Sequence, residues 1–315
     1  MASAQAIENR PLRGIALKIG AVFAFMAMYV LIKSAGRLPP GEIVFFRSFF
    51  ALIPVLAWVF SRGEGMVAFR TRDPMGHAWR GMIGVMSMGL GFYGLTILPL
   101  PEAVMIGYAM PFITVVFGAV FLGETVRLFR WSAVLAGLFG VLVISWPRLS
   151  VFSSGGQAAQ EQAFAALAVL GSAAFAAGAM IQVRKLVAHE ATMTIVIWFS
   201  VSSAALSLLT LPFGWQALTQ SQAGLLVAGG IAGGIGQIFL TSCYRYAGVS
   251  TIAPFEYVSL LLSVALGWLV FSEVPTAQTL FGGLIVVAAA LFIIWREHRL
   301  GLELKKASTA SLPQG

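Results

Sequence analysis

The chain has 315 residues, of which 59% are hydrophobic and only 10% are charged. A soluble domain carries about 25% charged residues, so the composition excludes a soluble enzyme and, being so apolar, an intrinsically disordered chain. The net charge of +8 would favour a nucleic-acid partner for a soluble protein. In so apolar a chain it indicates basic loops beside a lipid bilayer instead, and we expect no nucleic-acid partner.

Apolar stretches of about 20 residues, the length of a membrane-spanning helix, follow one another along the whole chain. They predict ten spanning helices joined by short connections, which leaves no room for a separate soluble domain. The longest internal connection, 63–80, is expected to be a loop, with an interfacial segment as the alternative. The tail from Lys305 is expected to be disordered. The predicted spans lie at about 14–33, 42–61, 79–98, 101–122, 131–147, 163–183, 192–212, 222–243, 251–271 and 276–295.

The basic residues are distributed unevenly between the two sides of this predicted bundle. Sixteen of the 20 Lys and Arg residues fall on the side of the N-terminus, three fall on the other side, and Arg47 lies inside the second span. Basic loops stay in the cytoplasm, so both termini are predicted to be cytoplasmic. That topology requires an even number of spans, in agreement with the count of ten.

The chain also repeats itself at a distance of 149 residues. The matching segments contain five spans, and because five is odd the second copy must enter the membrane the other way up. Inverted repeats are typical of secondary transporters, whose halves exchange conformations around a central site; the alternative is a duplication without functional meaning. The matching pairs are Gly81 and Gly230, Gly84 and Gly233, Tyr108 and Tyr257, Gly118 and Gly267, and Glu124 and Glu273.

The two halves carry a family resemblance. The segment 98–144, with Pro111, Glu124, Gly137 and Gly140, resembles the EamA-type domain of the drug/metabolite transporter superfamily, as does 250–293, with Glu273 and the pair Gly282–Gly283. Arg47 resembles an arginine of that family's second span. Within the superfamily the chain looks most similar to bacterial inner-membrane exporters of amino acids and metabolites, a group that includes the aromatic amino-acid exporters. Leu260 stands where the first half has Pro111, and Pro254 lies earlier, which leaves the kink of the ninth span open.

The resemblance implies an all-α polytopic membrane protein with ten transmembrane helices, arranged as two inverted five-helix repeats around a central cavity. We expect the first repeat at 1–147, a linker at 148–162, the second repeat at 163–295 and a cytoplasmic tail at 296–315. The expected location is the bacterial inner membrane, where the protein would be a monomer or a homodimer.

Polar side chains within the spans are the candidates for substrate binding, because such groups are costly in a membrane. The tyrosines combine an apolar ring with a polar tip, glutamine amides suit the ends of a zwitterion, and a carboxylate suits an amine or a proton. The alternatives are an aromatic belt at the interface, interhelical hydrogen bonds and a carboxylate that reaches water. The predicted substrate-binding residues are Tyr93, Tyr108, Gln182, Gln237, Glu256 and Tyr257.

Three further residues are predicted to have structural or gating roles. Pro111 is expected to kink the fourth span, and Pro254 to loosen the backbone of the ninth. For Arg47 we favour a structural role, either snorkelling or pairing with Glu42; attraction of a substrate carboxylate is the alternative.

The expected function is export of small amphipathic metabolites, with amino acids as the expected class, by alternating access. The alternatives are a carrier of nucleobases, drugs or lipid-linked sugars and, less favoured, an intramembrane enzyme. No cofactor or metal is expected, since Asp73 is the sole aspartate, Cys243 the sole cysteine, and all three histidines are placed in loops or at the C-terminal end. Glu102 and Glu256 are the candidate proton carriers, and facilitated transport is equally compatible with the sequence.

Overall fold

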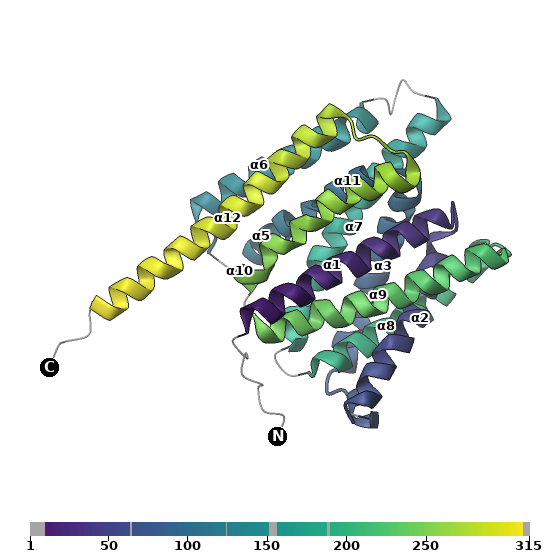
Figure 1. The fold of residues 1–315 in the computed structure, drawn as a ribbon, viewed down its shortest axis with the longest axis horizontal. Helices are drawn as coiled ribbons and strands as arrows, with labels where there is room; N and C mark the ends of the chain where they lie inside the picture. Colours follow the sequence, from purple (N-terminus) through teal and green to yellow (C-terminus); the bar gives the residue numbers. More distant parts are fainter. Residues whose placement is uncertain are drawn as a thin grey trace.

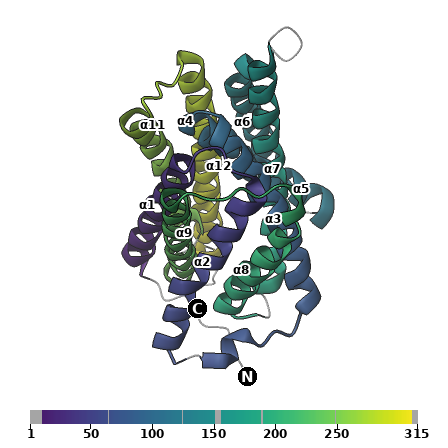
Figure 2. The ribbon, with the colours of Figure 1, turned by 90° about the vertical axis from the view of Figure 1, so that its right-hand side faces the viewer.

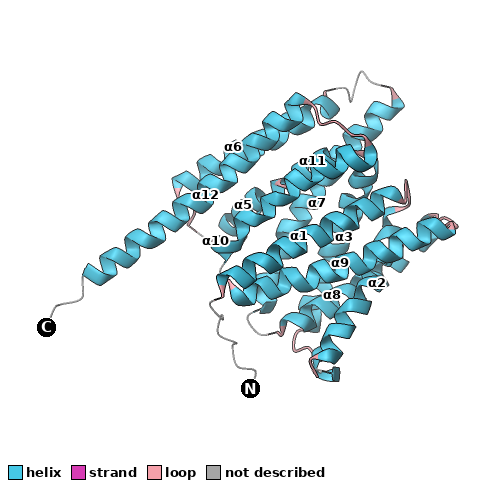
Figure 3. Cartoon of the chain, viewed as in Figure 1, coloured by secondary structure: helices cyan, strands magenta, loops and turns pink. Residues whose placement is uncertain are grey.

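The protein is a bundle of long helices in the computed structural model (Figure 1). The structure describes residues 10–63, 65–123, 125–150, 156–187, 190–247 and 249–310. Helices and their connections make up these ranges, and no strand is found within them (Figure 3). Glu124 and His189, considered above, lie outside the described residues.

The first half makes five crossings, and the fourth crossing is broken into two helices. Proline begins α1, α2 and α3 and is the second residue of α4, where its missing N–H costs nothing because the first turn has no acceptor for it. The helices are α1 (Pro11–Ser34), α2 (Pro40–Ser61), α3 (Pro74–Ile97), α4 (Leu100–Gly107), α5 (Ala109–Leu122) and α6 (Leu128–Leu149), with the short 3₁₀ helix η1 (Gly65–Phe69) before α3.

The second half repeats this order, and its fourth crossing is broken as well. A capping box between Thr219 and Gln222 begins its third crossing and satisfies backbone donors of the first turn. The elements are α7 (Gln157–Val187), α8 (Thr192–Leu208), η2 (Leu211–Phe213), α9 (Gln220–Tyr246), α10 (Val249–Ile252), η3 (Ala253–Tyr257), α11 (Val258–Phe271) and α12 (Ala277–Ala310).

Length and composition agree with a polytopic membrane protein. Within the described residues, eight helical segments are long and apolar enough to cross a bilayer. The other two crossings are α8, which has 17 residues, and α3, which carries His77 and Arg80 in its first turns. Large apolar side chains such as Leu135 and Phe139 of α6 point out of the bundle, where lipid would solvate them. The predicted fold class is therefore confirmed.

The packing of the helices follows the repeat. Helix α1 lies along α9 on one flank, and the equivalent pair, α7 along α3, lies on the other (Figure 2). The fifth crossings of the two halves, α6 and α12, run side by side (Figure 1), and the second crossings α2 and α8 also pack on each other. A pseudo-twofold axis produces this packing. A pair of helices either recurs as an equivalent pair, or consists of one helix and its own equivalent from the other half.

The backbone conformation repeats too. Helix α5 ends at Gly123 with φ of 65°, and α11 ends at Ser272 with φ of 56°. These residues are 149 positions apart, so both halves stop their fourth crossing with the same left-handed turn. Glycine adopts it without strain, whereas Ser272 is the one non-glycine residue with positive φ in the described ranges.

Two predicted boundaries were wrong. Helix α3 begins at Pro74, so the second part of the expected loop 63–80 is helical, with Asp73 accepting a hydrogen bond from Gly76 N at its start. Helix α12 continues to Ala310, where disorder was expected from Lys305. The range expected to link the two repeats, 148–162, contains the end of α6 at Leu149 and the start of α7 at Gln157. Hydrophobic composition predicts the apolar part of a helix. It does not predict the polar turns by which a helix extends beyond the bilayer.

Candidate functional site

The breaks in the fourth and ninth crossings lie at equivalent positions. Pro111 cannot donate to the carbonyl of Gly107, and its ring displaces that carbonyl, so α4 ends and α5 begins around Tyr108. In the second half Pro254 leaves the carbonyl of Ser250 without its donor, and α10 gives way to η3, which ends at Tyr257. The prolines occupy different positions, yet both breaks end at the tyrosine of the repeat. The kink left open by the sequence thus lies at 253–257.

The two repeat-related tyrosines meet between the halves. Their rings stack with centroids 5.2 Å apart. The Tyr108 hydroxyl donates to the carbonyl oxygen of Glu256 at 2.7 Å, which leaves Ser259 Oγ to donate to Tyr108 Oη at 2.6 Å. Tyr108 is buried. We call these four residues, Tyr108, Glu256, Tyr257 and Ser259, the tyrosine junction; it joins the broken helix of one half to that of the other.

The carboxylate of Glu256 is ion-paired. Lys18 Nζ of α1 lies 3.0 Å from Glu256 Oε2, and Lys18 is buried while half of the Glu256 side chain is exposed. Sequence reasoning counted Lys18 with the basic loop residues and missed this pair. The available signal was a lysine several residues inside the first apolar stretch.

Two arginines lie inside the bundle, Arg47 buried and Arg80 half-buried. Arg80 of α3 lies over the ring of Phe199 of α8 at 3.9 Å, and Arg47 of α2 lies 5.7 Å from the same ring centroid. Of the two structural roles considered for Arg47, pairing with Glu42 is not found: no ion pair joins these two described residues, and the Glu42 carboxylate accepts a hydrogen bond from Gln216 N. Arg80 had been placed in a loop and was missed as a site residue. We call Arg47 and Arg80 the arginine pair; both lie near the ring of Phe199.

We name the two ends of the bundle by their charge. The basic end holds the turns near residues 70–73 and 190–191, and the opposite end holds the turn near 35–39 and the helix ends at Leu149 and Gln157. At the opposite end, Lys33 lies 3.0 Å from Glu273 and donates to the carbonyls of Leu95 and Leu98. Glu273 also accepts from Leu100 N at 2.7 Å, so it caps α4 of the other half.

Glu102, the other candidate proton carrier, is ion-paired too. Arg148 of α6 holds its two oxygens with two bonds of 3.0 Å and reaches Gln162 of the second half at 2.6 Å. Both candidate proton carriers are thus paired with cations in this conformation.

At the basic end, Glu190 ties the second half to the first. It accepts hydrogen bonds from Thr71 Oγ1 at 2.7 Å, Arg72 N at 2.6 Å and Asp73 N at 3.2 Å, and His77 Nε2 lies 3.9 Å away. Burial raises the pKa of Glu190, but these hydrogen bonds and His77 outweigh burial and hold the pKa below its ordinary value. We call this the Glu190 clamp.

His77 was predicted to lie in a loop, and this was wrong. It lies in the first turn of α3, buried, with its ring stacked on Trp198 at 5.7 Å. Trp198 Nε1 in turn donates to the carbonyl of Phe69.

Three predicted binding residues are not joined to the tyrosine junction by hydrogen bonds or ring stacking. Tyr93 of α3 packs against the main hydrophobic core. Gln182 of α7 and Gln237 of α9 are half-buried, and neither side chain makes a hydrogen bond with the part of the chain that the structure describes.

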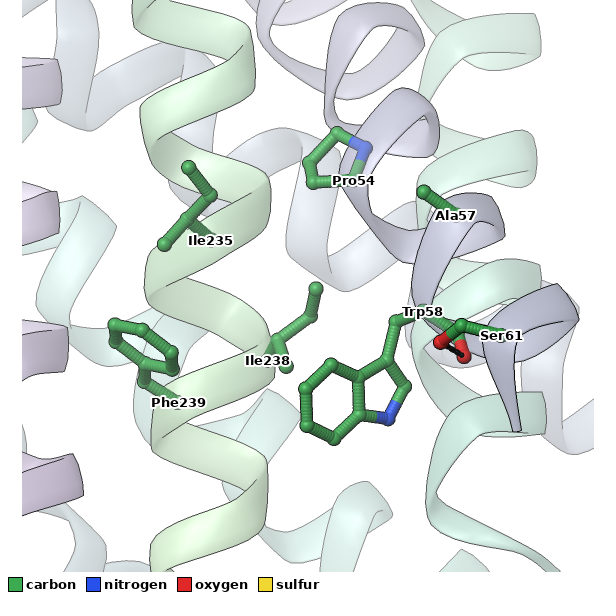
Figure 4. Close-up of a pocket in the computed structure, with 7 residues that line it drawn as sticks. All are labelled: Pro54, Ala57, Trp58, Ser61, Ile235, Ile238 and Phe239. Carbon is green, nitrogen blue, oxygen red and sulfur yellow. Dashed lines mark hydrogen bonds between the residues drawn. The ribbon is translucent and has the colours of Figure 1, made fainter.

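An apolar groove of about 400 Å³ lies between α2 and α9 (Figure 4). Trp58 and Phe239 face it from the two helices, and Pro54 lies at one end. Ser61, its polar member, donates to the carbonyl of Trp58, so the lining offers little to a polar ligand. The groove contains none of the predicted substrate-binding residues.

Comparison with known proteins gives one family and several transporters. The model of the EamA-like transporter family matches residues 12–146 and 163–295. The chain is 33% identical to the pseudopaline exporter of Pseudomonas aeruginosa, over 88% of this chain and 94% of that protein. It is 29% identical to the S-adenosylmethionine uptake transporter of Rickettsia felis (91% and 94% covered) and 26% identical to the riboflavin transporter of Vibrio cholerae (91% and 94% covered).

A solved crystal structure has the same fold. It aligns with a TM-score of 0.64 over 91% of this chain and 98% of its own, at 22% identity. The relatives named above are not aromatic amino-acid exporters, so the finer resemblance within the superfamily finds no support among them.

Proposed function

This chain belongs to the EamA-like transporter family, and from that premise we propose that it exports a small amphipathic metabolite across the bacterial inner membrane by alternating access. The protein is a multi-pass membrane transporter of a small metabolite and not an enzyme. The export direction, the class of substrate and the location are the proposed parts.

The tyrosine junction is the observation that carries the mechanism. Unwound backbone within a membrane is tolerated where it is buried in protein or lines a cavity, and transporters place substrate sites at such breaks between their repeats. Here the two breaks meet: Tyr108 of one half donates to the backbone of Glu256 in the other and stacks on Tyr257. A substrate that separates the two rings would therefore loosen the contact between the halves.

Alternating access is supported by contacts between the halves at both ends. Lys33 and Glu273 join them at the opposite end, and the Glu190 clamp joins them at the basic end. Opening either end requires its own contacts to break while those of the other end hold. Because the halves are equivalents of each other, exchanging their conformations interconverts the two open states.

Export and an amphipathic substrate are inferred from two sources. The relative with 33% identity is named as an exporter, although another is named for uptake. The tyrosine junction offers aromatic rings beside the Glu256 carboxylate, a setting for an apolar body with a polar or cationic end. Amino acids fit this description and stay the first class to test. The excess of basic residues on the N-terminal side supports cytoplasmic termini.

Counterflow in proteoliposomes tests the proposal. Vesicles are loaded with one unlabelled solute from a panel of amino acids, nucleobases, S-adenosylmethionine and riboflavin, and uptake of the same labelled solute is followed. We expect trans-stimulated uptake of at least one solute, absent from protein-free vesicles. Absence of exchange for the whole panel, with folded protein in the vesicles, would contradict the proposed substrate class. Transport assays in everted membrane vesicles then assign the direction.

A further inference from the structure

We propose that Arg47 and Arg80 together bind a carboxylate group of the substrate. The proposal rests on the proposed transport function and specifies its substrate class as organic carboxylates. It is independent of the tyrosine junction, because it depends on a different pair of side chains.

Both arginines have guanidinium nitrogens that are shielded from solvent and have no acceptor in the described part of the chain. Arg47 is 6% exposed. Its Nε, and the Nε and Nη1 of Arg80, are shielded from solvent and make no hydrogen bond within the described part of the chain. The two groups also lie close enough to repel each other. A buried cation without a partner is costly, and two of the same sign cost more, so this arrangement is explained by a ligand that supplies the missing negative charge.

Within the described residues, no carboxylate is left to pair with the two arginines. Each acidic side chain that the structure describes has another partner. Glu42 accepts from Gln216 N, Asp73 caps α3, Glu102 holds Arg148, Glu161 holds Arg37, Glu190 forms its clamp, Glu256 holds Lys18 and Glu273 holds Lys33. The counter-charge must therefore come from a molecule outside this part of the chain.

The arginines pack closely against two glycines, one from each half. A Cβ atom at Gly84 would lie 2.6 Å from Arg80 Nη1 and would also contact the Phe199 ring. One at Gly233 would lie 2.7 Å from Met28 Sδ and 3.5 Å from Arg47 Nε. These glycines are equivalents in the repeat, so both halves contribute a position without a side chain to this region. A bulkier residue at Gly84 would displace the guanidinium group that we assign to the ligand.

The arginines themselves do not follow the repeat. Val196 stands at the equivalent of Arg47, and Gly229 at the equivalent of Arg80. Groups that maintain a pseudo-symmetric scaffold are expected in both halves, as the glycines are. A pair of charges in the first half alone suits the recognition of an asymmetric molecule.

The chemistry of the pair favours a carboxylate on an organic body. The guanidinium fork matches the two oxygens of a carboxylate, and Phe199 and Met28 give apolar surroundings.

Thermal stabilisation of the purified protein tests this site without a transport assay. The probes are acids paired with their neutral amides (benzoate and benzamide, succinate and succinamide, phenylalanine and phenylalaninamide), with inorganic phosphate as a separate probe. We expect at least one acid to raise the melting temperature well above its amide. In Arg47→Met and Arg80→Met the half-saturating concentration of that acid should rise about 10- to 100-fold. Arg47→Lys and Arg80→Lys should fall in between, since lysine keeps the charge and loses the fork.

Arg37→Met is the matched control, because it removes a positive charge from an exposed ion pair with Glu161. It should bind the acid as the wild type does. The unliganded Arg47→Met protein should melt no lower than the wild type, since an unpaired buried charge has been removed. Equal stabilisation by acids and amides, an equal loss in Arg37→Met, or a lower melting temperature of unliganded Arg47→Met would each overturn the proposal. Phosphate binding that matches the acids would replace the organic carboxylate by a general anion site.

The carboxylate site and the transport function can fail independently in these two experiments. Acid binding that depends on the arginines, without counterflow of that acid, would support the site and contradict the carrier for that class. Counterflow of neutral solutes alone, with no acid-specific stabilisation, would support the carrier and overturn the site.

Discussion

Tyr108 and Tyr257 are equivalents in the repeat and stack on each other, but their hydroxyl groups have different partners. The Tyr108 hydroxyl lies between the Glu256 carbonyl and Ser259. That of Tyr257 makes no hydrogen bond with the residues that the structure describes. The pair therefore offers two variants that each remove one hydroxyl group from the same ring stack.

We predict that Tyr108→Phe lowers the counterflow rate about 3- to 10-fold, because it removes two hydrogen bonds that join the halves, each worth about 1 kcal/mol. Tyr257→Phe should retain most of the wild-type rate. Both variants keep the ring stack, so the comparison isolates the hydroxyl groups. Equal rates in the two variants would show that the junction acts through its rings alone.

The Glu190 clamp predicts a dependence of stability on pH. The hydrogen bonds from Thr71, Arg72 N and Asp73 N hold the pKa of Glu190 below that of an unfolded chain, about 4.3. Ionised Glu190 therefore stabilises the folded protein above that pH, and the contribution is lost as the pH falls through the lower, folded-state pKa.

Glu190→Gln should lower the free energy of unfolding by about 1–3 kcal/mol at pH 7, seen as a lower melting temperature. The difference from the wild type should shrink as the pH is lowered below 4. Glu161→Gln, which removes a carboxylate from an exposed pair, should change little at either pH. A difference that stays constant down to pH 3 would assign the effect of Glu190→Gln to packing.

Some residues of the site could be predicted from their type and position in the sequence, and others could not. Tyr108, Tyr257 and Glu256 stood out because polar groups in spans are rare, and the structure brings them together. Lys18 and Arg80 were counted with the basic loops, because a charge near the end of an apolar stretch has the same sequence signature whether it faces water or turns inward. Only the direction of the side chain distinguishes the two cases.

At the scale of elements, the breaks in the fourth and ninth crossings have a local cause and a shared position. Proline removes a backbone donor in each half, at Pro111 in one and at Pro254 in the other. Sequence analysis predicted both disturbances, yet it did not predict that both end at the repeat tyrosine. The positions of the breaks agree because α4 and α11 pack on each other.

Pro111→Ala should restore a donor to the Gly107 carbonyl and favour a continuous helix across Tyr108. We expect the counterflow rate to fall about 10-fold or more at a normal level of membrane-inserted protein, since the Tyr108 hydroxyl would leave its partners. Pro147→Ala, in the last turn of α6, is the control and should transport as the wild type does. An unchanged rate for Pro111→Ala would separate the break from transport.

Glycines of the two fifth crossings, α6 and α12, contact each other across the two halves. A Cβ at Gly140 would lie 2.9 Å from the Gly282 carbonyl oxygen, and one at Gly282 would lie 2.7 Å from that of Gly140. Helices α6 and α12 thus touch backbone to backbone, which requires small residues. The sequence showed the glycines in both halves, whereas their contact with each other follows from the packing.

For the whole molecule, the ion pair of Lys33 and Glu273 predicts which end can be loosened selectively. Glu273 binds Lys33 and caps α4 of the other half. Neutralising it should favour opening of the opposite end while the Glu190 clamp stays intact.

A cysteine reporter measures this opening. In a Cys243→Ser background, Ala103→Cys places a thiol at a buried position of α4 near the opposite end. Adding Glu273→Gln should speed its reaction with a polar maleimide in nanodiscs about 5- to 10-fold, as expected for the loss of a charge-assisted hydrogen bond that holds the closed state. Arg37→Met, at the same end, is the control, and an equal acceleration by both variants would contradict a specific latch.

The sequence by itself determined the helical membrane fold, the ten crossings and the five-crossing repeat, because apolar length, charge asymmetry and periodicity are properties of the chain read in order. It also marked Tyr108, Tyr257 and Glu256 as unusual. The tertiary structure decided which polar groups are partners: Lys18 with Glu256, Arg148 with Glu102, Glu190 with the 71–73 turn, and Arg47 beside Arg80. Such pairs join residues far apart in the chain, and the cost of burying a charge depends on what surrounds it in space.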